Sequence, residues 1–347
     1  MRWKWVIAAL VGLLLIGVYS SVSSGIRRDL ERTLSAACRR QVTIQSARLL
    51  LPAGARLTGI HVPRLPAEQA PPFSVEEIRV RVSGAALASG RIGAELEMVR
   101  PKIYTEWTRE TRDYLQYLGL VRSEGASIEM TGFRIREGDL TLVDRTVIPN
   151  FWWRLRDTSL EVHPGPGEGR YRFRLSAALQ TEAGEPTGTI QAEGSFFPRG
   201  PVDAKVLLTH ERIQDLAPYL QPALGTGPGQ GRIGLETRLT VLQGVLMAHN
   251  EVSAEGVAFP TEEPTTLGPD GNRLARMLAD REGKIHLSFV VSGKLGQKMD
   301  WSDLAAGALH EAMRQAMMRS IQNVLGEKEQ KQPVGEEVRK GLESLGR

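Results

Sequence analysis

Polar and apolar side chains alternate with a period of two along most of this 347-residue chain, in short runs separated by glycine and proline. In one run, Ile78, Val80 and Val82 fall on one side, and Arg79 and Arg81 fall on the other. Successive side chains of a strand point to opposite faces, so this pattern predicts strands with one apolar face and one wet face. Similar strands are predicted at residues 92–99, 133–136, 138–143, 155–162, 171–179, 188–196, 202–209, 232–241, 245–254 and 285–292.

The connections between these strands indicate how they are arranged. Short turns rich in glycine and proline, such as residues 163–169 and 197–201, predict an antiparallel meander. An antiparallel sheet must cover its apolar face with another layer or with a ligand. The expected fold is therefore mainly β, either a two-sheet sandwich or a long curved antiparallel sheet whose apolar face forms a groove. A few helices are expected at residues 106–119, 211–220, 272–280 and 302–325, the last of them amphipathic.

An apolar run at the start of the chain indicates where the protein is located. Residues 5–22 carry no charge and span about 27 Å as a helix, at about 1.5 Å per residue, which is close to a bilayer core of roughly 30 Å. We interpret residues 1–24 as an uncleaved transmembrane anchor, with a cleaved signal peptide as the alternative. Arg2 and Lys4 precede this run and favour a cytoplasmic N-terminus with an exported remainder.

Charge and cysteine content narrow the range of partners. Residues 1–41 hold seven basic and two acidic side chains, whereas the whole chain has a net charge of +4. The rest of the chain therefore carries −1 and lacks the positive field that binding to a phosphate backbone requires, so no nucleic-acid partner is expected. The single cysteine, Cys38, excludes an intramolecular disulfide. It continues an apolar repeat of four residues from Ile26, which predicts a juxtamembrane amphipathic helix at residues 25–41.

Local motifs give no support for catalysis. Residues 229–234 match the glycine pattern of a dinucleotide-binding loop, but a predicted strand follows them where that loop requires a helix. His310 and Glu311 lie on a predicted helix, but Arg314 stands where a zinc protease has its second histidine. No nucleophile elbow or phosphate-binding loop occurs in the sequence. We therefore expect a protein that is not an enzyme and that uses no cofactor and no metal.

The order of several segments resembles a known family. One of them, at residues 133–149, combines Gly138, an alternating strand with Leu140 and Leu142, and then Asp144. The others lie at residues 30–62, 74–83, 99–104, 188–220, 246–260 and 279–296. In this order the chain resembles the AsmA-like superfamily of bacterial envelope proteins (the AsmA/TamB type), and in particular its branch of AsmA-like domains of unknown function. The resemblance covers most of residues 1–300.

This resemblance implies a single-pass protein of the bacterial inner membrane, with most of the chain in the periplasm. It implies lipid binding or lipid transport in a β-sheet groove, and a role in outer-membrane biogenesis and lipid homeostasis. The expected partners are the inner membrane, a phospholipid or other envelope lipid, and proteins of the cell envelope. The expected parts are an anchor at 1–24, a juxtamembrane helix at 25–41, an AsmA-like domain at 42–300, an amphipathic helix at 301–325 and a charged tail at 326–347.

The apolar strand faces supply the candidate lipid-binding side chains. They are Ile78, Val80, Val82, Phe133, Ile135, Leu140, Leu142, Tyr171, Phe173, Leu175, Ile190, Val206, Ile233, Leu235, Leu287 and Phe289. Burying one CH₂ group contributes about 0.8 kcal/mol, so an apolar groove holds a lipid without any catalytic residue. The same side chains suit a closed core equally well. The alternative function is therefore a structural or scaffolding envelope protein with a closed β core that acts through protein partners.

Overall fold

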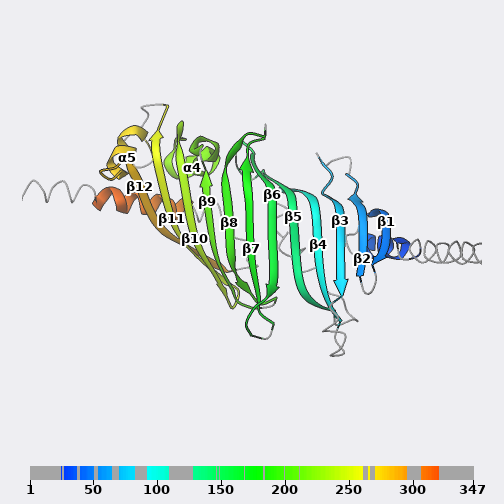
Figure 1. Cartoon of the computed structure of the whole chain (residues 1–347). Helices are drawn as coiled ribbons and strands as arrows, with labels where there is room; N and C mark the ends of the chain where they lie inside the picture. The colour runs from blue at the N-terminus through cyan, green and yellow to red at the C-terminus, as the bar shows by residue number, and fades with distance from the viewer. Residues whose placement is uncertain are drawn as a thin grey trace, which may run out of the picture. The chain divides into compact units, whose positions relative to one another are not determined.

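The computed structural model shows that the protein is mainly β, as the alternation predicts. Twelve strands form one mixed sheet, and the strand order in the sheet follows the chain order (Figure 1). The structure describes residues 25, 27–36, 40–50, 54–64, 70–82, 92–108, 128–145, 147, 149–167, 169–182, 184–198, 200–210, 212–260, 265, 270–294 and 306–319. In this part of the chain, no helix is long and apolar enough to cross a membrane. The predicted anchor at residues 1–24 lies outside the described residues, as do most of the predicted helix at 106–119 and the tail at 326–347.

The strands match the predicted runs closely. Their bounds are β1 (Thr43–Leu50), β2 (Gly54–Val62), β3 (Phe73–Val82), β4 (Ile92–Trp107), β5 (Ile128–Asp144), β6 (Phe151–Pro164), β7 (Tyr171–Gln180), β8 (Pro186–Phe196), β9 (Val202–His210), β10 (Gln230–Leu242), β11 (Val245–Ala258) and β12 (Lys284–Lys294). Between them lie η1 (Ile213–Leu216), α4 (Ala217–Leu224) and α5 (Gly271–Leu278). Two further helices cover residues 27–36 and 306–319.

Two details of the sheet differ from the expectation. β4 and β5 are parallel, from Ile92 beside Ile128 to Trp107 beside Asp144, so the sheet is mixed and not purely antiparallel. Alternation has the same period in both kinds of pairing, so the sequence pattern cannot distinguish them. The predicted strands at 133–136 and 138–143 are one strand, β5, because the break in alternation at Glu137 is a bulge and not a turn.

A line of bulges crosses neighbouring strands of the sheet. Gly59 in β2, Arg100 in β4, Glu137 in β5 and Asp157 in β6 all have left-handed backbone, with φ between 49° and 61°. The register shifts at this line between β5 and β6 and between β6 and β7, whereas β2, β3, β4 and β5 keep one register across it because the extra residue recurs in neighbouring strands. The alternation changes phase across the line, so residues of the other parity keep the same face. Exposed ion pairs link Arg100 to the neighbouring strands, since Nη1 lies 3.0 Å from Oε2 of Glu76 in β3 and Nε lies 3.4 Å from Oε2 of Glu137 in β5.

The chain divides into two compact units. Unit 1 comprises residues 1–208 with 241–243, and unit 2 comprises residues 209–240 with 244–347. In unit 1, the side chains of Leu30 and Leu34 from helix 27–36 pack against a buried cluster formed by Val42, Ile44, Ala47, Leu57, Ile60, Val62 and Val75. The same helix covers backbone donors of β1 and the residue before it. The amide of Ile44 donates to Glu31 Oε1, and that of Val42 donates to Ser35 Oγ, each over 2.8 Å.

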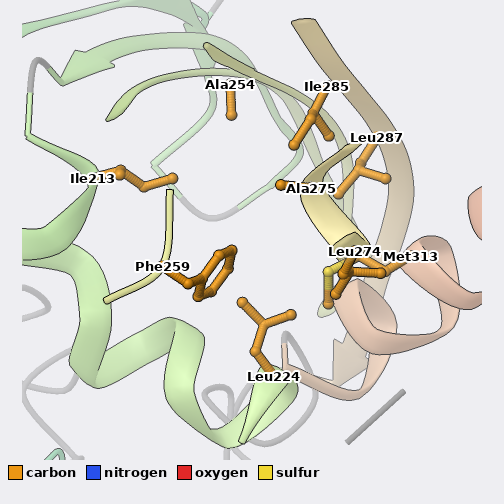
Figure 2. Close-up of a cluster of buried hydrophobic side chains, with 9 residues drawn as sticks. All are labelled: Ile213, Leu224, Ala254, Phe259, Leu274, Ala275, Ile285, Leu287 and Met313. Atoms are coloured by element: carbon orange, nitrogen blue, oxygen red, sulfur yellow. The ribbon is translucent and has the colours of Figure 1, made fainter. Parts of the chain in front are cut away.

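Unit 2 has a closed hydrophobic core (Figure 2). The core brings together side chains from η1, α4, α5, helix 306–319 and the strands β11 and β12, and Phe259 follows β11 directly. Its members are Ile213, Leu224, Ala254, Phe259, Leu274, Ala275, Ile285, Leu287 and Met313. Asn272 fixes the chain after β11, because its amide oxygen accepts from the amide of Phe259 and its Nδ2 donates to the carbonyl of Phe259. Helices therefore cover the apolar face of the strands in this unit.

The packing of unit 2 gives a first prediction. Leu274 is 1% exposed at the centre of the core, so Leu274→Ala removes buried contacts and leaves a cavity. We expect the free energy of unfolding to fall by about 3 kcal/mol, measured by chemical denaturation followed by circular dichroism. Met318→Ala is the matched control, because Met318 is 46% exposed on helix 306–319 and its truncation should cost less than about 0.5 kcal/mol. Equal losses in the two variants would contradict this account of the core.

Candidate functional site

The cross-strand register of unit 1 brings many of the predicted lipid-binding side chains onto one face. Residues directly opposite one another on neighbouring strands point to the same side of a sheet. One apolar row follows from consecutive pairs across β3 to β8: Ile78, Met98, Ile135, Leu160, Leu175 and Ala192. A second row lies beside it: Val80, Leu96, Phe133, Val162, Phe173 and Gly194. We call the side of the sheet that carries these rows the apolar face of unit 1.

Other predicted residues extend this face. Val82 is opposite Ala94, Tyr171 is opposite Phe196, and Ile190 is opposite Ala177. Leu140 and Leu142 lie beyond the line of bulges, where the alternation has changed phase. A Cβ built on Gly138 would lie 3.0 Å from Cγ2 of Ile135, so position 138 and therefore Leu140 and Leu142 share the face of Ile135. Val206 lies in β9 and is half-buried.

Helices do not cover the apolar face evenly in unit 1. Near β1 to β3, the buried cluster under helix 27–36 includes partly buried contacts from Phe73, Ile78 and Met98. Neither of the two hydrophobic clusters found among the described residues includes a side chain of β5, β6, β7 or β8. On this part of the face Ile135, Val162, Ala177 and Leu179 are buried, with 2% to 7% of each residue exposed, whereas Phe133, Phe173 and Leu175 are half-buried. In the described part of unit 1, the apolar face over β5 to β8 thus carries both buried and half-buried side chains, and neither hydrophobic cluster extends to it.

An aromatic group lies at one end of this face. The rings of Tyr171 and Phe196 stack with their centroids 5.6 Å apart, and the ring of Phe173 lies 6.2 Å from that of Phe196. Phe173 is directly opposite Gly194 on the neighbouring strand. A Cβ added to Gly194 would lie only 2.2 Å from the carbonyl oxygen of Asp203, so this position has room only for glycine. Phe196 was not among the predicted site residues. Its phase in the alternating run 188–196 was the signal that could have identified it.

The four predicted residues of unit 2 lie in a different environment. Leu287 is 8% exposed within the closed core, and Ile233 packs against that core. Leu235 and Phe289 are half-buried, two positions further along their strands. Opposite Phe289 is Asn250, a buried polar side chain that sequence reasoning missed. Its Oδ1 accepts from Thr237 Oγ1 over 2.8 Å, and its Nδ2 donates to the carbonyl of Ala248 over 3.1 Å, so burial leaves this amide hydrogen-bonded.

The opposite face of unit 1 carries a network of ion pairs across β2 to β5. Glu77 accepts from Arg56 over 2.5 Å and also from Arg79. Arg79 lies 3.3 Å from Glu97, which Arg136 contacts at 2.8 Å. Both carboxylates are buried although they lie on the polar face, because the long arginine side chains cover them.

The same pattern continues across β5 to β8. Arg134 lies opposite Glu161, Glu161 opposite Arg174, and Arg174 opposite Glu193. The ion pair between Arg134 and Glu161 measures 3.3 Å, and that between Arg174 and Glu193 measures 3.9 Å. Alternating charges therefore line up on the face that points away from the apolar rows. This network was not predicted, although the charges themselves were visible in the sequence, because their pairing depends on the register.

Neither comparison of the sequence with known proteins adds to this picture. No family model matches the chain, and no curated protein matches it significantly. Among the described residues, no group of three or more histidine, cysteine, aspartate or glutamate side chains could hold a metal ion. The resemblance to AsmA-like proteins thus rests on the sequence segments named above.

The ion-pair network gives a prediction about pH. Burial raises the pKa of Glu77, but hydrogen bonds from Arg79 and Arg56, together with their charges, outweigh it and hold the pKa below its usual range. A carboxyl group whose pKa is lower in the folded state than in the unfolded state stabilises the fold at any pH above the unfolded pKa. This stabilisation is lost as the pH falls through the folded pKa. We expect Glu77→Gln to lower the free energy of unfolding by about 2 kcal/mol at pH 7 and by much less in acid.

Denaturant titrations at pH 7 and below the ordinary glutamate pKa of 4.5 test this prediction. Glu251→Gln is the matched control, because Glu251 is exposed on β11 and forms no ion pair among the described residues. A loss of stability from Glu77→Gln that is the same at both pH values would contradict the ionic role of Glu77.

Proposed function

We propose that this chain is an AsmA-like envelope protein that binds or conducts lipids on the apolar face of unit 1. The observation that carries the proposal is the set of apolar rows across β3 to β8, in which Phe133, Phe173 and Leu175 are half-buried and which neither hydrophobic cluster of the described residues reaches beyond β4. Exposure of such an apolar surface to water is unfavourable. Covering it with acyl chains is favourable by about 25 cal/mol per Å² of apolar area buried. The long curved groove expected from the sequence is part of this proposal.

The polar face supports the same function. Its ion pairs, from Arg56 across to Glu193, give the sheet one well-hydrated side, so a lipid on the other side leaves the protein compatible with water. Binding by an apolar surface needs no general acid, no nucleophile and no metal, in agreement with a protein that is not an enzyme. The ligand class favoured by this surface is a phospholipid or another envelope lipid with long acyl chains.

The cellular setting is proposed from the start of the sequence and from the family resemblance. The uncharged run at residues 5–22 and the preceding Arg2 and Lys4 support a single-pass anchor in the inner membrane with the remainder in the periplasm. A protein anchored there with a lipid-binding sheet would contribute to outer-membrane lipid homeostasis and envelope biogenesis, with envelope proteins as further partners.

One observation favours the second candidate function, a scaffold with a closed core. In unit 2, helices cover the strand face and bury Leu287, one of the residues predicted to bind lipid. If a comparable layer closed over β5 to β8, the protein would act through its outer surface and its partners. A test must therefore report directly on what contacts the apolar face of unit 1.

Site-specific photocrosslinking provides that test. A photoreactive benzoylphenylalanine replaces Leu175 on the apolar face in the full-length chain, which is expressed in bacterial cells and irradiated. We expect mass spectrometry to find the probe at position 175 joined to a phospholipid or another acyl-chain lipid, because Leu175 lies in an apolar row between Leu160 and Ala192.

Arg174 is the matched control position, since it is the neighbouring residue and its side chain is exposed on the polar face. The probe at position 174 should capture no lipid. Crosslinks from position 175 to protein alone, or equal lipid capture at both positions, would overturn the proposal in favour of the scaffold.

A further inference from the structure

Exposed apolar side chains gather at the ends of strands in unit 1. Among the described residues of this unit, five large hydrophobic side chains are exposed: Leu49, Leu50, Phe197, Leu207 and Leu242. Leu50 and Leu242 end strands and Phe197 follows one directly, whereas Leu49 lies one residue before the end of β1 and Leu207 lies within β9. Single exposed hydrophobic residues are normal on a protein surface, but a shared location is a reason to look for a contact.

The register places Leu50 and Phe197 at the same end of the strands of unit 1. Pro164, Tyr171 and Phe196 form one row there, and Phe197 comes directly after it. Leu50 is opposite Gly54, and Gly54 is opposite Arg81, so β1 and β3 finish at the same end as each other. β3 is antiparallel to β4, β4 is parallel to β5, and β5 is antiparallel to β6, so β3 and β6 finish at the same end.

Basic side chains accompany these apolar positions. Arg81 and Arg172 are exposed, and neither has a carboxylate partner among the described residues. Beside Arg172, a shallow depression of about 540 Å³ on the polar face is also lined by Arg170, Arg174 and Lys205. The carboxylates that line it are Glu161, Glu193 and Asp203. Glu161 and Glu193 are in ion pairs with Arg134 and Arg174 respectively, and the four basic side chains that line the depression outnumber its three carboxylates by one.

We propose that this end of the strands of unit 1, which carries Leu50, Arg81, Arg172 and Phe197, docks on an anionic lipid bilayer. We call it the turn edge. Phe197 and Leu50 enter the boundary between headgroups and acyl chains, while Arg81 and Arg172 contact lipid phosphates. Aromatic, leucine and arginine side chains are the ones that bind this boundary in peripheral membrane proteins.

The proposal deepens the proposed function, on which it rests for the nature of the cargo. The apolar face reaches the turn edge without a polar break, because Phe173 is followed there by the stacked rings of Tyr171 and Phe196. An acyl chain that leaves the bilayer at the turn edge therefore passes from lipid onto aromatic rings and then onto the aliphatic rows. The turn edge is in this way an entry point for lipid.

Local fluorescence in the full-length chain tests this docking. In a Cys38→Ala background, an environment-sensitive dye is attached at Phe197→Cys, and the chain is reconstituted into vesicles of phosphatidylcholine with or without phosphatidylglycerol. Leu207→Cys is the matched control, because Leu207 is 39% exposed, as against 37% for Phe197, but lies away from the turn edge. The dye reports its own surroundings, so insertion of the anchor does not affect the comparison.

We expect the dye at position 197 to shift to shorter wavelength and to be quenched several-fold more by doxyl-labelled lipids than the dye at position 207. Quenching should be stronger with phosphatidylglycerol, and Arg172→Glu should remove that increase. Leu50→Cys is a second reporter in case the first variant misfolds. Dyes at 197 and 50 that are no more quenched than the dye at 207 would overturn the docking.

The two proposals fail separately. Lipid capture at position 175 without quenching at 197 and 50 overturns the turn edge and leaves lipid binding in place. Quenching at the turn edge without lipid capture at 175 supports docking and overturns the entry of cargo onto the apolar face.

Discussion

The separation of charge and apolar surface onto the two faces of one sheet is the constraint on which the rest of this molecule depends. A shift of the register by one residue would move Arg79, Arg134 and Arg174 onto the apolar side of the sheet and expose the rows beside them. Cross-strand ion pairs such as that between Arg136 and Glu97 oppose such a shift, because a slipped strand would leave the buried carboxylate of Glu97 without its arginine partner. The polar network thus specifies the pairing that creates the apolar face.

The line of bulges allows long strands to keep this separation. Without a change of phase at Glu137, β5 would place Ile135 and Leu140 on opposite faces, since they are five residues apart. The bulge restores both to one face and also turns a break in the sequence pattern into a continuous strand. Arg100 connects the bulged residue of β5 with Glu76 of β3, so the line is supported by charge as well as by backbone geometry.

The same alternation leads to two outcomes in this chain. In unit 2, α4, α5 and helix 306–319 supply the second layer, and Leu287 becomes part of a closed core. In unit 1, helix 27–36 packs on the cluster near β1, and neither hydrophobic cluster of the described residues extends to the apolar rows of β5 to β8. The difference lies in which helices are near each strand, and this is the physical basis for proposing a lipid-binding role for one unit and a structural role for the core of the other.

The sequence by itself determined the strands and the two-sided character of each one, because a period of two is a local property that survives any pairing. It also supplied most of the apolar rows, including Val80, Phe173 and Leu175, as residues of a common type. Only the tertiary structure decided that β4 and β5 are parallel, that 133–143 is one bulged strand, and that Leu287 is enclosed while Leu175 is half-buried. These features depend on which strand or helix lies beside a residue, and contacts between distant segments leave no period in the sequence.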